Sequence, residues 1–169
     1  MPRIDKILYA TDLSKNSAYA FRYATDIADK HNAFIHILNV LEELPESAKT
    51  VLKNYLSDDQ YEKFRNRKDD LKGVIKERLS VFCDNVQKDD PQCVFRVASI
   101  DMIEGNPVNE ILKYAENNHC DLIVMGTHGK GILTHAILGS VAEKVIRKSK
   151  IPVMVIPIPE DETSLTYEI

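Results

Sequence analysis

Two kinds of hydrophobic pattern alternate along the chain. Several apolar runs are almost continuous, which is typical of strands covered on both faces. Others recur at helical spacing between those runs. Runs rich in β-branched residues predict strands at 6–10 (KILYA), 33–40 (AFIHILNV), 94–100 (VFRVASI), 121–125 (DLIVM) and 151–156 (IPVMVI). The pattern therefore favours a buried parallel sheet with helices packed against it.

The helical spacing is clearest in four segments. Segment 14–31 has one apolar stripe, and segment 69–87 has another. Asn106 is a suitable N-cap for a third helix, with Pro107 at its first position. A last helix is expected near Ser140, because S-V-A-E is the capping-box pattern.

The order of these elements predicts the fold class. The chain reads β-α-β, a long helical stretch, β-α-β, a loop, and α-β. We expect an α/β fold with an open five-stranded parallel sheet, order 3-2-1-4-5, and helices on both faces. Residues 1–158 are predicted to form a single domain with a helical insertion at about 42–70, a solvated arm or lid. Residues 159–169 form an acidic tail.

Composition and charge limit the partners and the cellular location that we expect. With 22 Lys and Arg against 26 Asp and Glu, the formal net charge of -4 does not favour nucleic acid as a partner. No stretch approaches the roughly 18 apolar residues of a membrane span. The three cysteines, Cys83, Cys93 and Cys120, match neither a zinc site nor a disulfide framework. We therefore expect a cytoplasmic protein that does not contact membranes.

Four of the six glycines lie in residues 126–140 (GTHGKGILTHAILGS), between a predicted strand and the last helix. Ligands of open parallel sheets bind beyond the carboxyl ends of the strands. A helix that starts after Gly139 would direct unpaired N–H groups at an anion, and glycine lets the anion approach. Gly126, Gly129 and Gly131 would allow the chain to turn at positive φ. The loop therefore predicts a phosphate site.

Two other interpretations of the loop stay open on composition alone. Glycines after a strand also make tight turns, and the loop contains neither G-x-x-x-x-G-K-[ST] nor G-x-G-x-x-G. A metal site would need His119 and Cys120 to converge with His128 and His135, without the usual ligand spacing.

The glycine spacing matches a more specific pattern. Gly126-x2-Gly129-x9-Gly139-Ser140 resembles the nucleotide-binding signature G-x2-G-x9-G-[ST] of the universal stress protein family, in its ATP-binding, universal stress protein A-like branch. The resemblance covers nearly the whole chain, through KILYATDLSKNSAYA, LNV, EGNP, DLIVMGTHGKG and SKIPVMVIP. It implies a Rossmann-like, adenine nucleotide alpha hydrolase-like fold that binds ATP with Mg2+.

The resemblance also assigns the site residues. It places the strand-end acid, here Asp12, at the ribose, and the topology independently brings Asp12 beside Gly126. A helix cap is the alternative role for Asp12. The backbone of Val40 falls on the adenine contact. The other positions implied for ATP are Ala10, Thr11, Met125, Gly126, Gly129, Lys130, Gly139, Ser140 and Val141. Ala10 departs from the proline of many family members.

The resemblance implies a function of binding rather than catalysis. An ATP-binding stress-response protein would act as a nucleotide-dependent switch or as a platform for a protein partner. We expect slow or no hydrolysis, because the loop offers no clear general base. Strand 151–156 is expected to form a homodimer edge. The alternative is an adenylyl-transfer or ATP-hydrolysing enzyme on a related fold, which would carry S-G-G-x-D-S or H-I-G-H where this chain has ATDLSKNS.

Overall fold

The computed structural model describes residues 3–12, 17–42, 46–60, 62–63, 96–127 and 138–157, with single helical residues at 73, 77, 80, 81 and 84. One parallel sheet has the order β3-β2-β1-β4-β5. Its strands are β1 (Lys6–Thr11), β2 (Phe34–Glu42), β3 (Val97–Gly105), β4 (Leu122–Gly126) and β5 (Val153–Ile156). The predicted fold class and strand order are therefore confirmed.

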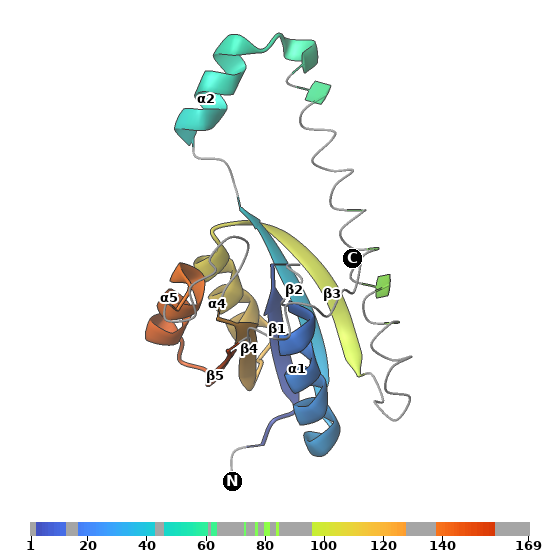
Figure 1. The fold of residues 1–169 in the computed structure, drawn as a ribbon. Helices are drawn as coiled ribbons and strands as arrows, with labels where there is room; N and C mark the ends of the chain where they lie inside the picture. The colour runs from blue at the N-terminus through green and yellow to red at the C-terminus, as the bar shows by residue number, and fades with distance from the viewer. Residues whose placement is uncertain are drawn as a thin grey trace.

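Helices cover both faces of the sheet (Figure 1). Helix α1 (Ser17–His31) packs on one face, and its stripe of Ala20, Phe21, Ala24 and Ala28 is buried. Helices α4 (Pro107–Asn117) and α5 (Ser140–Lys148) pack together on the other face. Residues of β1 and β4 alternate between the two clusters, so both central strands are buried on both sides.

Strand β1 is fixed at its amino end and in its centre. The Asp121 carboxylate accepts hydrogen bonds from the backbone N–H groups of Asp5 and Lys6 at 2.8 and 2.9 Å, which joins the start of β1 to the start of β4. Tyr9 is fully buried, packs on Phe21 with ring centroids 5.0 Å apart, and donates its hydroxyl hydrogen to a carbonyl in the first turn of α1. These contacts set the position of β1, from which the site extends.

Strand β3 differs most from the sequence prediction. The apolar pattern predicted residues 94–100, whereas the strand runs from Val97 to Gly105 and includes Asp101 and Glu104. As an edge strand it pairs only with β2, and most of its residues are half-buried. Polar side chains are tolerated at such an edge, so hydrophobicity alone placed the strand too early.

The entry to α4 follows the prediction. Asn106 is the N-cap, its side chain accepts a hydrogen bond from the Asn109 N–H at 3.2 Å, and Pro107 occupies the first turn. Gly105 has φ +152°, and a Cβ there would lie 2.8 Å from the Glu110 side chain. This position therefore requires glycine for its conformation and for its space.

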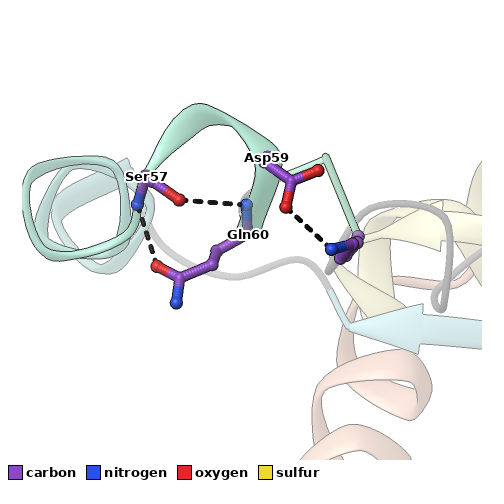
Figure 2. A network of polar contacts seen from close by, with 4 residues as sticks. Ser57, Asp59 and Gln60 are labelled. Atoms are coloured by element: carbon purple, nitrogen blue, oxygen red, sulfur yellow. Dashed lines mark hydrogen bonds and ion pairs between the residues drawn. The ribbon is translucent and has the colours of Figure 1, made fainter.

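The predicted insertion contains helix α2 (Glu46–Tyr55), which stands clear of the sheet and has no buried residue (Figure 1). A second helical turn begins after Ser57, where Ser57 and Gln60 exchange side-chain and backbone hydrogen bonds as a capping box (Figure 2). Most of the helix predicted at 69–87 and the acidic tail at 159–169 lie outside the described residues.

The Asp121 contacts lead to a stability prediction. Replacing Asp121 with Ala removes the acceptor of two part-buried backbone N–H groups, so we expect a loss of about 1–3 kcal/mol in the free energy of unfolding. Urea denaturation measures the loss. Asp26→Ala is the matched control, because it breaks only an exposed ion pair with Lys30. Equal stability of the two variants would contradict this role of Asp121.

Candidate functional site

The direction of winding reverses between β1 and β4, which are neighbours in the sheet. Ala10 pairs with Met125, and both side chains are buried. Asp12 follows the end of β1, and Gly126 is the last residue of β4. The structure therefore brings Asp12 and Gly126 to one edge of the sheet, at the position where such folds bind ligands.

Asn39 fixes the end of β1 and was not singled out from the sequence. Its side chain is buried on β2, level with Thr11, and its Nδ2 donates to the Thr11 carbonyl at 2.9 Å. The adjoining Asp12 is half-buried, with one carboxylate oxygen fully covered. The signal was an amide side chain in the mostly apolar run FIHILNVL, since a buried amide needs a hydrogen-bond partner.

Helix α5 begins against the end of β4. The Thr127 carbonyl accepts a hydrogen bond from the Gly139 N–H at 2.8 Å, and the Thr127 N–H donates to the carbonyl of Ile156 at 3.0 Å. The glycine loop thus leaves the sheet and returns to it at the same point. Gly129, Lys130, Gly131, His128 and His135 lie outside the described residues, so their predicted roles stay predictions.

The start of α5 corrects the predicted capping box by one position. Gly139 is the N-cap, because its carbonyl accepts the first helical bond from the Glu143 N–H at 2.9 Å. Ser140 is the first helical residue, no side chain in the described part of the chain caps the start of this helix, and the Glu143 carboxylate pairs with Arg147 instead. The N–H groups of the first turn, at Ser140 and Val141, have no acceptor within the helix. They lie at the amino end of the helix dipole, where an anion is stabilised.

The backbone angles also correct one role predicted for the glycines. Gly126 ends β4 in a strand conformation and pairs with Ile156, and Gly105 is the one glycine at positive φ in the part of the chain described. Gly139 has φ -59° and ψ 147°, which any residue adopts. Conformation therefore does not explain glycine at 139, and the close approach of a ligand to its backbone stays a prediction.

Val40 lies on β2 beside the end of β1. Hydrogen bonds from the N–H of Phe34 to the residue before β1 and from the N–H of Ile35 to the residue before β3 fix the alternation along β2, which directs the backbone of Val40 toward β1. The strand extends two residues beyond Val40, to Glu42. Since β1 ends level with Asn39, the carbonyl of Val40 points past the end of β1, into the region expected for adenine.

His119 and Cys120 lie at the opposite end of β4 from this edge. Burial raises the pKa of the Cys120 thiol to about 11, so this cysteine stays protonated and unreactive at neutral pH. His119 and Cys120 precede β4, whereas the glycine loop follows it. Among the described residues no group of three or more His, Cys, Asp or Glu side chains is placed to hold a metal ion. Nor does any helix in those ranges have the length and apolarity needed to cross a membrane.

The comparisons with known proteins agree with this architecture. Universal stress protein MJ0577 of Methanocaldococcus jannaschii is 32% identical over 155 residues, covering 89% of this chain and 93% of the relative. The solved structure of MJ0577 has a TM-score of 0.65 at 33% identity and covers 90% of this chain and 95% of that one.

Two more distant structures share the fold. One is a universal stress protein in complex with cAMP, with TM-score 0.55, 21% identity, and 91% and 97% of the two chains covered. The other is a universal stress protein from Archaeoglobus fulgidus in complex with dAMP, with TM-score 0.55, 18% identity, and 92% and 99% covered.

The family model described as the universal stress protein family matches residues 3–157. That match includes every strand of the sheet and both sides of the glycine loop. The chain belongs to the universal stress protein family.

Proposed function

We propose that this protein binds ATP at the edge of the sheet where β1 and β4 end, and that it acts as a nucleotide-dependent switch or partner platform in a stress response. The observation that carries the proposal is the hydrogen bond between Gly139 and Thr127, which holds the uncapped start of α5 at the end of β4. Backbone N–H groups and a positive dipole end then lie at the same edge of the sheet as Asp12. This combination suits a phosphorylated ligand that also carries a ribose.

Each part of the nucleotide has a proposed partner. The phosphates lie against the N–H groups of Ser140 and Val141, where Gly139 lets them approach the backbone. The Asp12 carboxylate accepts hydrogen bonds from the ribose, and the backbone of Val40 contacts the adenine. Gly126, Gly129 and Lys130 complete the phosphate side, with Mg2+ held mainly by phosphate oxygens. The adenine nucleotides held by the two more distant relatives support this ligand class.

The proposed activity is binding with slow or no hydrolysis. Fast hydrolysis needs a group that orients or deprotonates a water in line with the γ-phosphate. The loop from Gly126 to Ser140 contains no Asp or Glu to serve as that base. A protein that holds ATP without consuming it keeps one conformation for long enough to be read by a partner protein in the cytoplasm.

A valine at position 139 tests the site directly. The Gly139→Val side chain would fill the space between the ligand and the start of α5, while the φ of -59° remains accessible to valine. We expect at least about a tenfold weaker Kd for ATP, or about 1.4 kcal/mol, by calorimetry. Native mass spectrometry of the purified wild type should detect bound adenine nucleotide.

Gly73→Val is the matched control, because a Cβ at this exposed glycine meets nothing within 4 Å. It should leave the Kd for ATP unchanged. Equal affinities of the Gly139→Val and Gly73→Val variants, at equal Tm, would rule out the proposed phosphate contact. Loss of folding in Gly139→Val alone would instead indicate that the glycine serves only the turn.

We further propose that the protein forms a homodimer through β5. This strand is at the sheet margin, and Met154 is 37% exposed. The carbonyls of Pro152 and Ile156 point toward β4, so the backbone of Val153 and Val155 points to the open edge. Antiparallel pairing of two such edges would satisfy these groups across a two-fold axis.

Val155→Pro tests the dimer, because proline removes an N–H that faces the open edge and leaves the ladder to β4 intact. We expect sedimentation to show a shift from dimer to monomer while far-UV circular dichroism stays unchanged. A Val155→Ala variant controls for the smaller side chain and should remain dimeric. An unchanged dimer in Val155→Pro would place the interface elsewhere.

A further inference from the structure

A second cluster of polar side chains lies under α4, away from the nucleotide edge. His36 on β2, Ser99 and Asp101 on β3, and Tyr114 on α4 are all half-buried and in mutual contact. The His36 and Tyr114 rings meet edge-to-face with centroids 6.1 Å apart. Three elements of the fold therefore converge on one polar group of four side chains, on a sheet face that is otherwise covered by apolar contacts.

A β-bulge places Ser99 in this cluster. Ile35 pairs with Val97, but the next residue of β2, His36, pairs with Ser99, so Ala98 is an extra residue in β3. Val97 packs into the cluster on the α1 face. Without the bulge, Ser99 would share that face, because strand residues two apart point to the same side. The bulge turns Ser99 to the α4 face, opposite His36.

The hydrogen bonds have a defined direction. Tyr114 donates its single hydroxyl hydrogen to the Asp101 carboxylate at 2.5 Å, so Ser99 must be the donor in the 3.0 Å contact between the two hydroxyls. Because Ser99 donates its hydroxyl hydrogen to Tyr114, it can only accept from His36. The 2.9 Å contact therefore requires the ring to donate from Nδ1. The chain of donors runs from His36 through Ser99 and Tyr114 to Asp101.

Charged groups on the neighbouring elements act on these hydrogen-bonded side chains. Lys6 on β1 lies on the same face and donates to the Asn118 carbonyl just after α4, while Asp101 on β3 closes the chain. Burial chiefly, and then Lys6, lower the pKa of His36 below its ordinary value of 6.5, and Asp101 opposes them. Burial and the bond to Asp101 raise the pKa of Tyr114 to about 12, so its hydroxyl stays protonated. Within this group of side chains, the His36 ring is the one that gains charge in mild acid.

We propose that His36, Ser99, Tyr114 and Asp101 form a pH-sensitive latch that fastens the carboxyl-terminal half of α4 to strands β2 and β3 and loosens in mild acid. With a neutral ring the donor chain is complete and adds no buried cation. A second proton on the ring places a positive charge in a half-buried position that faces Lys6. The latch acts on α4 alone and does not depend on nucleotide binding.

The direction of the pH effect follows from linkage. The pKa of His36 in the folded protein lies below 6.5, so the unfolded or undocked chain takes up the proton first. The stabilisation by the neutral ring is present above pH 6.5 and is lost as the pH falls through and below that value. A latch of this kind opens in the range where cytoplasmic acidification occurs, and it opens the helix that packs against α5.

Hydrogen exchange of the full chain tests the latch. After correction for intrinsic rates, the amides of Ile111, Leu112 and Ala115 should lose about twofold or more of their protection between about pH 7.5 and about pH 5.5. His36→Gln should abolish this pH dependence, because it keeps a donor without a titrating ring. His31→Gln is the matched control, since His31 is exposed at the end of α1, and it should behave as the wild type does.

Two further measurements keep the proposal testable if His36→Gln does not fold. Nitrogen NMR of the wild type should show the neutral His36 ring protonated at Nδ1, with a titration midpoint below 6.5. Tyr114→Phe keeps the ring packing, removes the link to Asp101, and should lower the protection of the α4 amides at about pH 7.5. A neutral ring protonated only at Nε2, equal pH dependence in the wild type and His36→Gln, or unchanged protection of α4 in Tyr114→Phe would overturn the latch.

Discussion

The parallel pairing of β1 with β4 is the contact on which the rest of the structure depends. It places the two central strands side by side although more than a hundred residues separate them in the chain. Asp121 fixes its amino end through the first backbone N–H groups of β1, and Tyr9 fixes its centre against α1. Both strands are buried on both faces, so their carboxyl ends are held rigidly at one edge. The proposed nucleotide site lies at that edge, where ligands of open parallel sheets bind.

Polar groups have different arrangements at the carboxyl edge of the sheet and under α4. At the carboxyl edge no side chain of the described residues caps the first turn of α5, and an anion is proposed to bind the N–H groups there. Under α4, each polar side chain of the His36 group has a hydrogen-bond partner, and the bulge in β3 brings Ser99 into the group. The first arrangement suits an exchangeable anion, and the second suits a fixed attachment that changes with protonation. Helix α4 packs against α5 and also carries Tyr114 of the second arrangement.

The sequence predicted what depends on apolar periodicity and on specific turn residues. Strands β1, β2, β4 and β5, the N-cap at Asn106 and the strand order all follow from such signals. The predicted strand 94–100 ended too early, because an edge strand tolerates Asp101 and Glu104, which break the apolar pattern. The N-cap predicted at Ser140 was wrong by one residue. Gly139 supplies the first helical carbonyl, and the Glu143 carboxylate pairs with Arg147.

Contacts between side chains that are distant along the chain could not be predicted from a single sequence. Asn39 and Ser99 are ordinary polar residues in strand segments, and only the register of β2 against β1 and β3 gives them partners. Gly126 was expected to turn the chain at positive φ, whereas it ends β4 in a strand conformation. The predicted role of Gly139, to leave room for a ligand beside the backbone, stays a prediction. The predicted roles of Gly129 and Lys130 stay predictions.

The most direct test of the account is a titration of the isotope-labelled protein with ATP and Mg2+, followed by amide NMR. If the phosphates bind at the start of α5, the backbone amide signals of Ser140 and Val141 should shift most strongly, with saturable changes at Asp12 and Val40. The amides of the α2 arm, which stands clear of the sheet, should remain in place. Shifts confined to other surfaces, or no saturable shift at Ser140 and Val141, would contradict the central claim.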